Sequence, residues 1–211
     1  MKRSAALFLS LFAATVAAHH AQAEMLCRAT PSLATVNYPG AKRIVPSNNL
    51  LLPAGKSIPA EGQKLLVIGR VLDNRCMPVP EAVVEMWQVN PFGQWLLAGP
   101  EDRVTPNPAF AGAGRAVTDT DGQFQFVTAF PAGVGKRAPN LNFKIFSDGE
   151  HSFSTVLFFA GDERNAADPI YQKLSTVARA DVTLRMGKTD DGDLAGTLDI
   201  VLPTRAEYRT Y

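Results

Sequence analysis

The chain has 211 residues, with 21 Lys and Arg against 20 Asp and Glu and a formal net charge of +1. No basic stripe and no run of like charges appears, so the sequence argues against nucleic acid and against an anionic membrane surface as partners. The length is sufficient for one domain with a substantial hydrophobic core.

The N-terminus has the pattern of a secretory signal peptide. Lys2 and Arg3 precede an apolar run over residues 5–18, and Ala21-Gln22-Ala23 has the small-x-small form of a signal-peptidase site. The apolar stretch is too short and one-sided for a good membrane anchor. An N-terminal core helix is the alternative to a signal peptide. We therefore predict that residues 1–23 are a signal peptide. The mature protein is then periplasmic or secreted, with no membrane insertion after signal removal.

Cys27 and Cys76 are the only two cysteines of the chain. An exported compartment permits a disulfide between them, but a bridge also requires their Cα atoms to approach within about 7 Å, which a sequence does not reveal. A disulfide and a pair of buried thiols are therefore both open.

Residues 24–63 carry several prolines and are predicted to form an irregular lead that wraps over the fold; we call this segment the lead. After it, short segments rich in β-branched and aromatic residues are separated by turn signals. The predicted strands cover residues 64–72, 83–89, 116–118, 123–127, 140–146, 155–159, 180–186 and 194–202. Residues 163–175 are predicted to hold a short helix, limited by Pro169.

Two of the turns, at residues 119–122 and 189–192, end in the glycine that a hairpin favours where φ is positive. At least seven short strands with little helical periodicity predict an all-β fold. We expect an antiparallel β-sandwich over residues 64–202, followed by a C-terminal tail at 203–211. Side chains alternate along a strand, so Asn140 and Asn142 should share one face of the segment 140–146.

Four blocks of sequence stand in order between residues 64 and 162. They are Gly69-Arg-Val-Leu-Asp73 with Pro78-Val-Pro-Glu-Ala-Val-Val-Glu-Met-Trp-Gln-Val-Asn90 and Gly93, then Gly114-Arg-Ala-Val-Thr-Asp-Thr-Asp-Gly-Gln-Phe-Gln-Phe126, Arg137-Ala-Pro-Asn-Leu-Asn-Phe143, and Leu157-Phe-Phe-Ala-Gly-Asp162. In these blocks the chain resembles the intradiol ring-cleavage dioxygenases, the family that includes protocatechuate 3,4-dioxygenase and catechol 1,2-dioxygenase. The resemblance implies the family's β-sandwich.

The resemblance also implies a ferric ion held by two tyrosinates and two histidines. The tyrosinates suit this ion, because Fe(III) is a hard ion that favours anionic oxygen donors. The family's Arg-Pro-Ala-His-x-His-Phe block places the two histidines at Asn140 and Asn142. One tyrosine falls near Val104, and the other falls near Val134 in a loop several residues shorter than usual.

A count of residue types supports the loss of this site. No tyrosine lies between Pro39 and Ile170, and the only histidine there is His151. The tyrosines of the chain are Tyr38, Tyr171, Tyr208 and Tyr211. We therefore predict no metal ligands, no catalytic residues and no cofactor, with the family's Fe(III) absent.

Other candidate sites have ordinary explanations. His151 follows Asp148-Gly149-Glu150 at an expected hairpin tip, where an exposed histidine is the simplest interpretation. The acidic groups near 119–122 and 190–193 are predicted to be turns rather than calcium loops. Trp87 is predicted to be a core residue.

Arg137 differs, because its counterpart in the family lies beside the iron and here it persists without the metal. With Asn140, Asn142, Val104 and Val134 it is predicted to line a pocket for a small aromatic or carboxylate ligand. A structural ion pair is the alternative.

Three functional hypotheses follow. The first is an exported intradiol dioxygenase-like protein that lacks the ferric site and acts as a non-catalytic binding or accessory module. The second is a non-catalytic subunit, in a homo- or hetero-oligomer with a related chain. The third is an enzyme that uses the same pocket with a different metal or with metal-free chemistry.

Overall fold

The computed structural model describes residues 26–35, 38, 44–52, 54–55, 57–96, 109–147 and 152–204. The predicted signal peptide, Val104, His151 and most of the C-terminal tail lie outside these residues. Within the described part of the chain, no helix combines the length and the apolar character needed to cross a bilayer.

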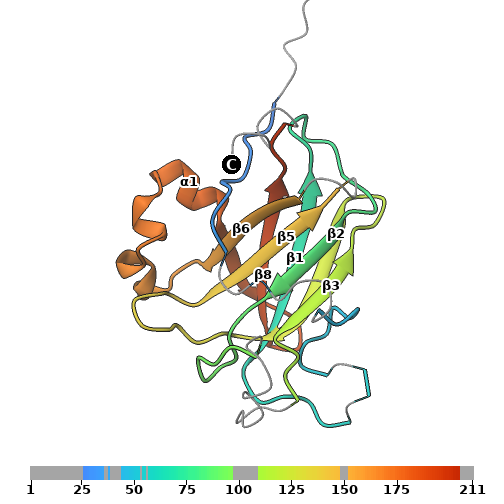
Figure 1. The fold of residues 1–211 in the computed structure, drawn as a ribbon, viewed down its shortest axis with the longest axis vertical. Helices are drawn as coiled ribbons and strands as arrows, with labels where there is room; N and C mark the ends of the chain where they lie inside the picture. Colours follow the sequence, from blue (N-terminus) through green and yellow to red (C-terminus); the bar gives the residue numbers. More distant parts are fainter. Residues whose placement is uncertain are drawn as a thin grey trace, which may run out of the picture.

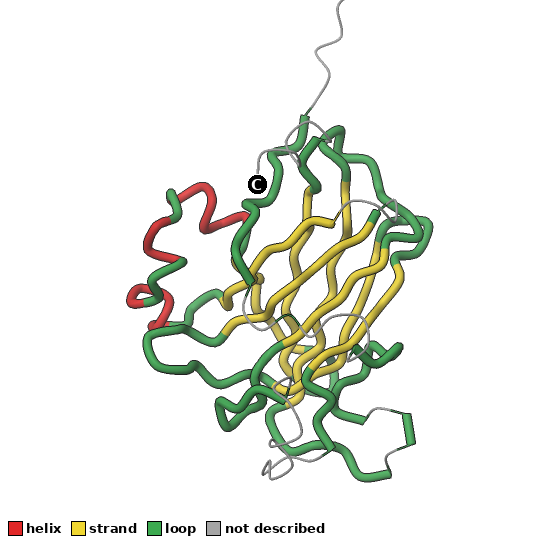
Figure 2. Tube along the Cα trace, in the orientation of Figure 1, coloured by secondary structure: helices red, strands yellow, loops and turns green. Residues whose placement is uncertain are grey.

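The described residues form eight strands that curl into a near-barrel (Figure 1). Their order across the sheet is β3-β2-β5-β6-β7-β8-β1-β4. The strands are β1 (Lys64–Leu72), β2 (Val83–Trp87), β3 (Ala113–Val117), β4 (Gln123–Ala129), β5 (Asn140–Phe146), β6 (Ser152–Phe159), β7 (Thr183–Lys188) and β8 (Leu194–Val201). Figure 2 shows the helical turns gathered on one side of the strands; they are η1 (Glu163–Ala167), η2 (Tyr171–Lys173) and α1 (Thr176–Asp181).

The predicted all-β fold is confirmed, and β1 and β5 have the predicted bounds. Two neighbouring pairs are parallel rather than antiparallel, namely β1 with β8 and β6 with β7. Parallel neighbours come from distant parts of a chain, so the turn signals that identify hairpins do not report them. Strand β2 ends earlier than predicted, and β3 and β6 begin earlier.

The prediction of a strand from residue 180 is wrong at its start. Residues 176–181 form helix α1, because the hydroxyl of Ser175 accepts a hydrogen bond from the N–H of Ala178 and caps the helix. Strand β7 begins only at Thr183. The short helix predicted at 163–175 is present as η1 and η2.

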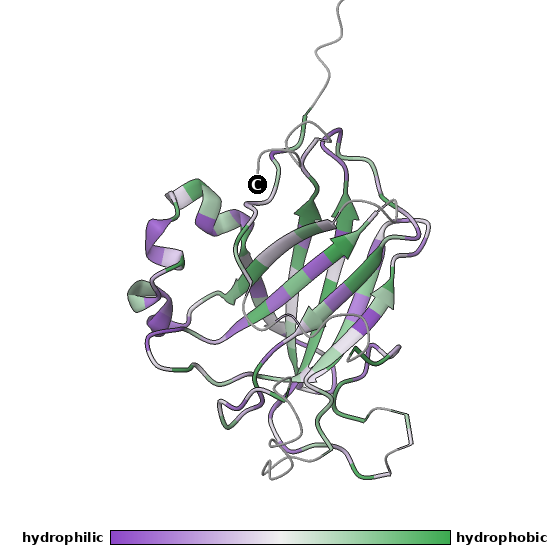
Figure 3. Ribbon diagram, in the orientation of Figure 1, coloured by the Kyte–Doolittle hydropathy of each residue, from purple (hydrophilic) through white to green (hydrophobic). Residues whose placement is uncertain are grey.

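The main core lies inside the near-barrel and is built from alternate residues of the strands. Leu141, Phe143 and Ile145 of β5 are buried there, as the alternation predicted. The ring of Phe143 lies 6.0 Å from that of Phe124 and 6.2 Å from that of Phe126, between centroids. Figure 3 shows apolar residues concentrated on the strands. Burial of each large apolar side chain stabilises the fold by about 1.5–3 kcal/mol.

One seam of the near-barrel lies between β3 and β4, which stand at opposite ends of the strand order. Lead residues 44–50 occupy part of it. The N–H of Arg115 donates to Ser47 O at 3.0 Å, and the N–H of Val127 donates to Asn48 O at 2.8 Å. Gly114 permits this approach, because a Cβ there would stand 2.4 Å from Ser47 O. The lead therefore bonds to both strand edges.

A second seam lies between β6 and β8. Strand β7 pairs with β6 only at residues 158–159 and with β8 only at residues 194–197. Beyond these pairs the lead contacts both strands. The N–H of Thr30 donates to Val201 O at 2.9 Å, and the N–H of Leu33 donates to Ser154 O at 3.1 Å. In Figure 1 this part of the lead runs beside β6.

Cys27 and Cys76 form a disulfide, with Cα atoms 5.2 Å apart and a sequence separation of 49 residues. The bridge joins the lead to the loop between β1 and β2. In the chain-entropy model, a loop of this length stabilises the folded state by about 4 kcal/mol. The structure thus selects the first of the two alternatives left open by the sequence.

Candidate functional site

Asn140 and Asn142, where the resemblance places the family's histidines, lie on the outer face of β5. Asn142 is fully buried and stands opposite Trp87 in the pairing of β2 with β5. Its Nδ2 lies 3.4 Å from both Trp87 O and Asn140 Oδ1. The Nδ2 of Asn140 donates to Ala138 O at 2.7 Å. The predicted shared face is confirmed, and the two carboxamides contact each other and the backbone.

Arg137 forms an ion pair with Asp168, a completely buried carboxylate directly after η1. Oδ2 of Asp168 accepts hydrogen bonds from Arg137 Nε at 2.7 Å and from the N–H of Ala138 at 2.9 Å. Its Oδ1 accepts from the N–H groups of Ile170 and Tyr171 at 2.8 and 3.1 Å. The carboxylate thus joins the start of β5 to the helical turns.

Burial alone would raise the pKa of Asp168, but the hydrogen bond from Arg137 and three backbone N–H donors outweigh it. The pKa of Asp168 therefore lies below its ordinary value, and the carboxylate is charged at neutral pH. The ion pair is formally neutral. The Nη2 atom of Arg137 is buried and has no hydrogen-bond partner among the described residues.

Val134, near which the resemblance places one of the family's tyrosines, lies in the turn that precedes β5 and is 41% exposed. Val134 and Arg137 exchange two backbone hydrogen bonds, of 2.9 and 3.2 Å. The turn is held from η1 by Arg164, whose Nη2 donates to Gly135 O and Arg137 O, each at 3.2 Å. The structure therefore brings Val134 and Arg137 into one turn.

Glu85 is a second buried carboxylate, on the outer face of β2, with 1% of its surface exposed. Its Oε1 accepts from Arg115 Nε at 3.0 Å, and the hydroxyl of Tyr38 donates to its Oε2. The Tyr38 ring meets the Trp87 ring edge-on at 4.9 Å, and Lys144 Nζ lies 4.4 Å from the Tyr38 ring centroid. Burial, reinforced by the hydrogen bond to Glu85, raises the pKa of the Tyr38 phenol well above its usual range.

Asp168, Glu85 and this role of Tyr38 were not predicted from the sequence. Glu85 had a signal, because a charged residue stands between Val84 and Met86 in an otherwise apolar strand. Asp168 gave no comparable signal, since its partner Arg137 is 31 residues away in the chain. Trp87 is fully buried, as predicted.

The donor set does not fit a ferric ion. Asn140 and Asn142 offer neutral amides already engaged with neighbouring groups, and Val134 offers only hydrocarbon. Of the two described tyrosines, Tyr38 has a raised pKa and donates to Glu85, and Tyr171 bonds to Thr183. The Tyr38 phenol is therefore a poor source of tyrosinate. Among the described residues, no three His, Cys, Asp or Glu side chains form a metal-binding group.

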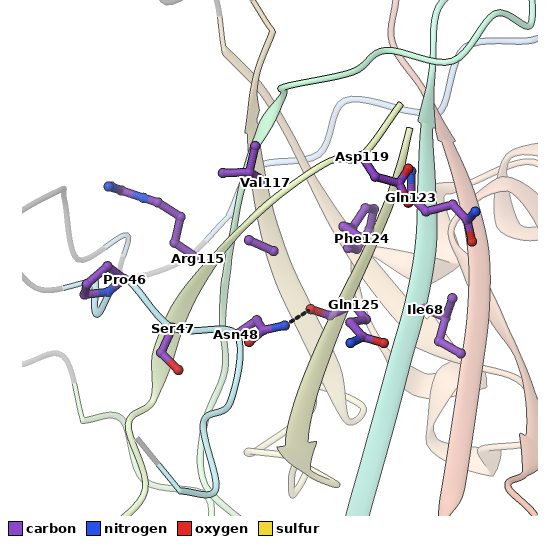
Figure 4. A pocket seen from close by; sticks show the side chains of 11 residues that line it. Pro46, Ser47, Asn48, Ile68, Arg115, Val117, Asp119, Gln123, Phe124 and Gln125 are labelled. Carbon is purple, nitrogen blue, oxygen red and sulfur yellow. Dashed lines mark hydrogen bonds between the residues drawn. The ribbon is translucent and has the colours of Figure 1, made fainter. Parts of the chain in front are cut away.

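Two surface hollows are lined by other residues. One, of about 570 Å³, lies at the seam between β3 and β4 (Figure 4). There Asn48 Nδ2 donates to Gln125 O at 3.1 Å, and Val117 stands 58% exposed. The other, of about 320 Å³, lies where the lead meets α1 and β8. Neither hollow is lined by Val134, Asn140 or Asn142.

Comparison with known proteins identifies the family. Residues 46–203 match the sequence profile described as Dioxygenase. The chain is 36% identical over 155 residues to the protocatechuate 3,4-dioxygenase β chain of Burkholderia cepacia, covering 68% of this chain and 66% of the relative. It is 31% identical over 137 residues to the α chain of the same organism, covering 63% of this chain and 68% of the relative. The chain belongs to the intradiol dioxygenase family, and its match spans just under two thirds of that β chain.

Solved structures agree on the fold. The dioxygenase domain of a dioxygenase carbohydrate-binding protein fusion from Streptomyces sp. SirexAA-E superposes with a TM-score of 0.65 at 23% identity, covering 84% of this chain and 99% of that domain. An intradiol ring-cleavage dioxygenase from Tetranychus urticae gives a TM-score of 0.65 at 19% identity, covering 83% of this chain and 94% of that one. At these identities the likeness concerns the fold alone.

Proposed function

We propose that the protein is an exported intradiol dioxygenase-like protein without ring-cleaving activity, which acts as a binding or accessory module. The observation that carries the proposal is the chemistry of the four ligand positions. Asn140, Asn142, Val104 and Val134 provide two amides and two hydrocarbon side chains where the family resemblance implies two imidazoles and two phenolates. Neither type supplies the anionic donors that Fe(III) favours.

Ring cleavage is tested with mature protein purified from iron-supplemented cells. We expect a colourless protein, because tyrosinate-to-iron charge transfer has no tyrosinate source, and no oxygen uptake with catechol or protocatechuate. Asn140→His with Asn142→His should not restore turnover, since the anionic donors would still be absent.

The control for ring cleavage adds Val104→Tyr and Val134→Tyr to the two histidines, which returns all four donors. Visible absorption with near-stoichiometric iron in the parent protein, or oxygen uptake by it, would overturn the proposal.

The proposed ligand pocket consists of Arg137, Asn140, Asn142, Val104 and Val134. A small aromatic or aliphatic acid would place its body against the valines and its carboxylate on the free Nη2 of Arg137. The ion pair with Asp168 favours the alternative of a structural Arg137, because Nε is engaged and the positive charge is neutralised.

One substitution separates the two roles of Arg137. If the pocket binds a ligand, Arg137→Ala should abolish saturable binding in a screen of aromatic acids while the protein stays folded. If Arg137 is structural, the same change should lower the melting temperature, and the parent should show no saturable binding.

A role as a non-catalytic subunit is the second candidate. It is favoured by the similarity to both the α and the β chains of protocatechuate 3,4-dioxygenase, since the names of those relatives describe a protein of two related chains. Sedimentation analysis of the mature protein should then show self-association, or association with a co-expressed related chain. A monomer that does not associate with such a chain would count against this role.

A further inference from the structure

The lead is held at the seam between β6 and β8 by few non-covalent contacts. Within the described part of the chain, five hydrogen bonds link residues 30–33 to these strands: two between Thr30 and Val201, one from Thr155 to Pro31, and one each from Ser32 and Leu33 to Ser154. Leu33 adds partly buried apolar surface. The Arg28–Asp181 pair is exposed on the arginine side and adds little.

The free energy that these contacts contribute is about equal to the conformational entropy cost of ordering the segment. One net hydrogen bond contributes about as much as the ordering of one backbone residue costs. Residues 27–33 are seven ordered residues, held by those five bonds, by the N–H of Cys27 donating to Asn74 O at 2.8 Å and by the Arg28–Asp181 pair. The covalent tie at Cys27 therefore decides whether the segment stays in the seam.

The two ends of the disulfide differ in rigidity. Cys76 lies in a turn organised by Asp73, whose Oδ1 accepts from the N–H groups of Arg75 and Met77 at 2.9 and 2.8 Å. The N–H of Cys76 also donates to Asp73 O at 3.0 Å. This turn does not require the bridge, whereas Cys27 lies in the irregular lead. Breaking the bridge thus leaves Cys76 in place and leaves Cys27 held to this loop by the hydrogen bond from its N–H to Asn74 O, of 2.8 Å.

We propose that the Cys27–Cys76 disulfide is a redox latch on the lead, whose reduction releases residues 27–33 from the seam while the near-barrel stays folded. Both cysteines are half-buried, so a small thiol reaches the bridge from solvent. A dithiol reductant gives up two electrons and two protons and becomes a disulfide. The S–S bond breaks, and each cysteine becomes a thiol.

Release would change the surface of the protein at a defined place. The hollow of about 320 Å³ has Cys27, Arg28 and Thr30 on one wall. The opposite wall comes from residues after position 179, including Asp181, Arg185 and Val201. Departure of the lead removes the first wall and exposes the backbone groups of Val201 that now bond to Thr30. Reduction of the disulfide would thus expose part of the edge of strand β8.

Amide hydrogen exchange on the full mature chain, with and without dithiothreitol, tests the latch. In the oxidised protein the amides of Thr30 and Leu33 should exchange slowly. After reduction they should exchange about 100-fold faster or more, which is the behaviour of a locally opened segment. The amide of Val71, bonded to Gly122 O within the sheet, should keep its rate.

Two variants complete the test. Cys27→Ser with Cys76→Ser should show the fast exchange without any reductant. Arg28→Ala, the matched control in the lead, should keep slow exchange at Thr30, because its disulfide is intact. Unchanged rates at Thr30 and Leu33 after reduction would overturn the latch, and so would an equal acceleration at Val71, which would mean loss of the whole fold.

Discussion

The two faces of strand β5 carry different kinds of information. The inner face presents Leu141, Phe143 and Ile145 to the main core, as a member of this fold must. The outer face presents Asn140 and Asn142 at the positions where the family resemblance implies histidines. Because adjacent residues of a strand point to opposite faces, the ligands of a metal can be exchanged without disturbing the packing that forms the fold. The family's fold therefore depends on the residues of the inner face, whereas metal binding depends on the residues of the outer face.

The largest effect should come from the inner face. Phe143→Ala should lower the free energy of unfolding by about 3–5 kcal/mol, because it removes a buried ring and leaves a cavity. Asn142→Ala, one residue away on the outer face, should cost about 1 kcal/mol, the value of a typical net hydrogen bond. Denaturant unfolding of the two variants measures the difference, and equal losses would remove the distinction between the faces.

A substitution of Asp168 tests whether residues outside the main core, beside the start of β5, also stabilise the fold. Asp168→Asn removes the charge that compensates Arg137 in a buried pair, so the free energy of unfolding should fall by about 3 kcal/mol. Asp199→Asn is the matched control, because it breaks the exposed pair with Arg70 and should cost less than about 1 kcal/mol. Similar melting curves for the two variants would show that the buried pair contributes no more than a surface pair.

The acid limb of stability should depend on the same carboxylate. The pKa of Asp168 is lower in the folded state than its unfolded value of about 3.9. The ionised carboxylate therefore contributes its full share to the free energy of unfolding above that value. The contribution is lost as the pH falls through the lower folded pKa. Unfolding measured between neutral and strongly acid pH should show a steeper loss in the parent than in Asp168→Asn. Parallel acid limbs would contradict this assignment.

The smallest effect should follow from Tyr38→Phe. The change keeps the ring against Trp87 and removes only the hydroxyl that donates to Glu85, so the loss should be about 1 kcal/mol. In an alkaline ultraviolet titration the parent should retain one late-ionising phenol that the variant lacks, because the Tyr38 pKa is raised. A variant that loses an ordinarily ionising phenol and no late-ionising one would mean that Tyr38 ionises normally.

Local patterns predicted the bounds of β1 from its β-branched run and those of β5 from its alternation. The strand prediction was wrong at residues 180–181, because helix α1, which is capped at Ser175, continues to Asp181. Local patterns also gave no access to the parallel pairs or to the Arg137–Asp168 ion pair. Those features join residues that only the folded chain brings together.

The irregular lead has a consequence for where the folding unit begins. The region of family similarity starts at residue 46. A polypeptide cut at that point would lose Thr30, Leu33 and Cys27, and with them the cover of one seam. Its exposed strand edges would be templates for pairing with other chains, the usual origin of β-aggregation. For this protein, the start of the profile match and the start of the segment that covers this seam are two different positions in the chain.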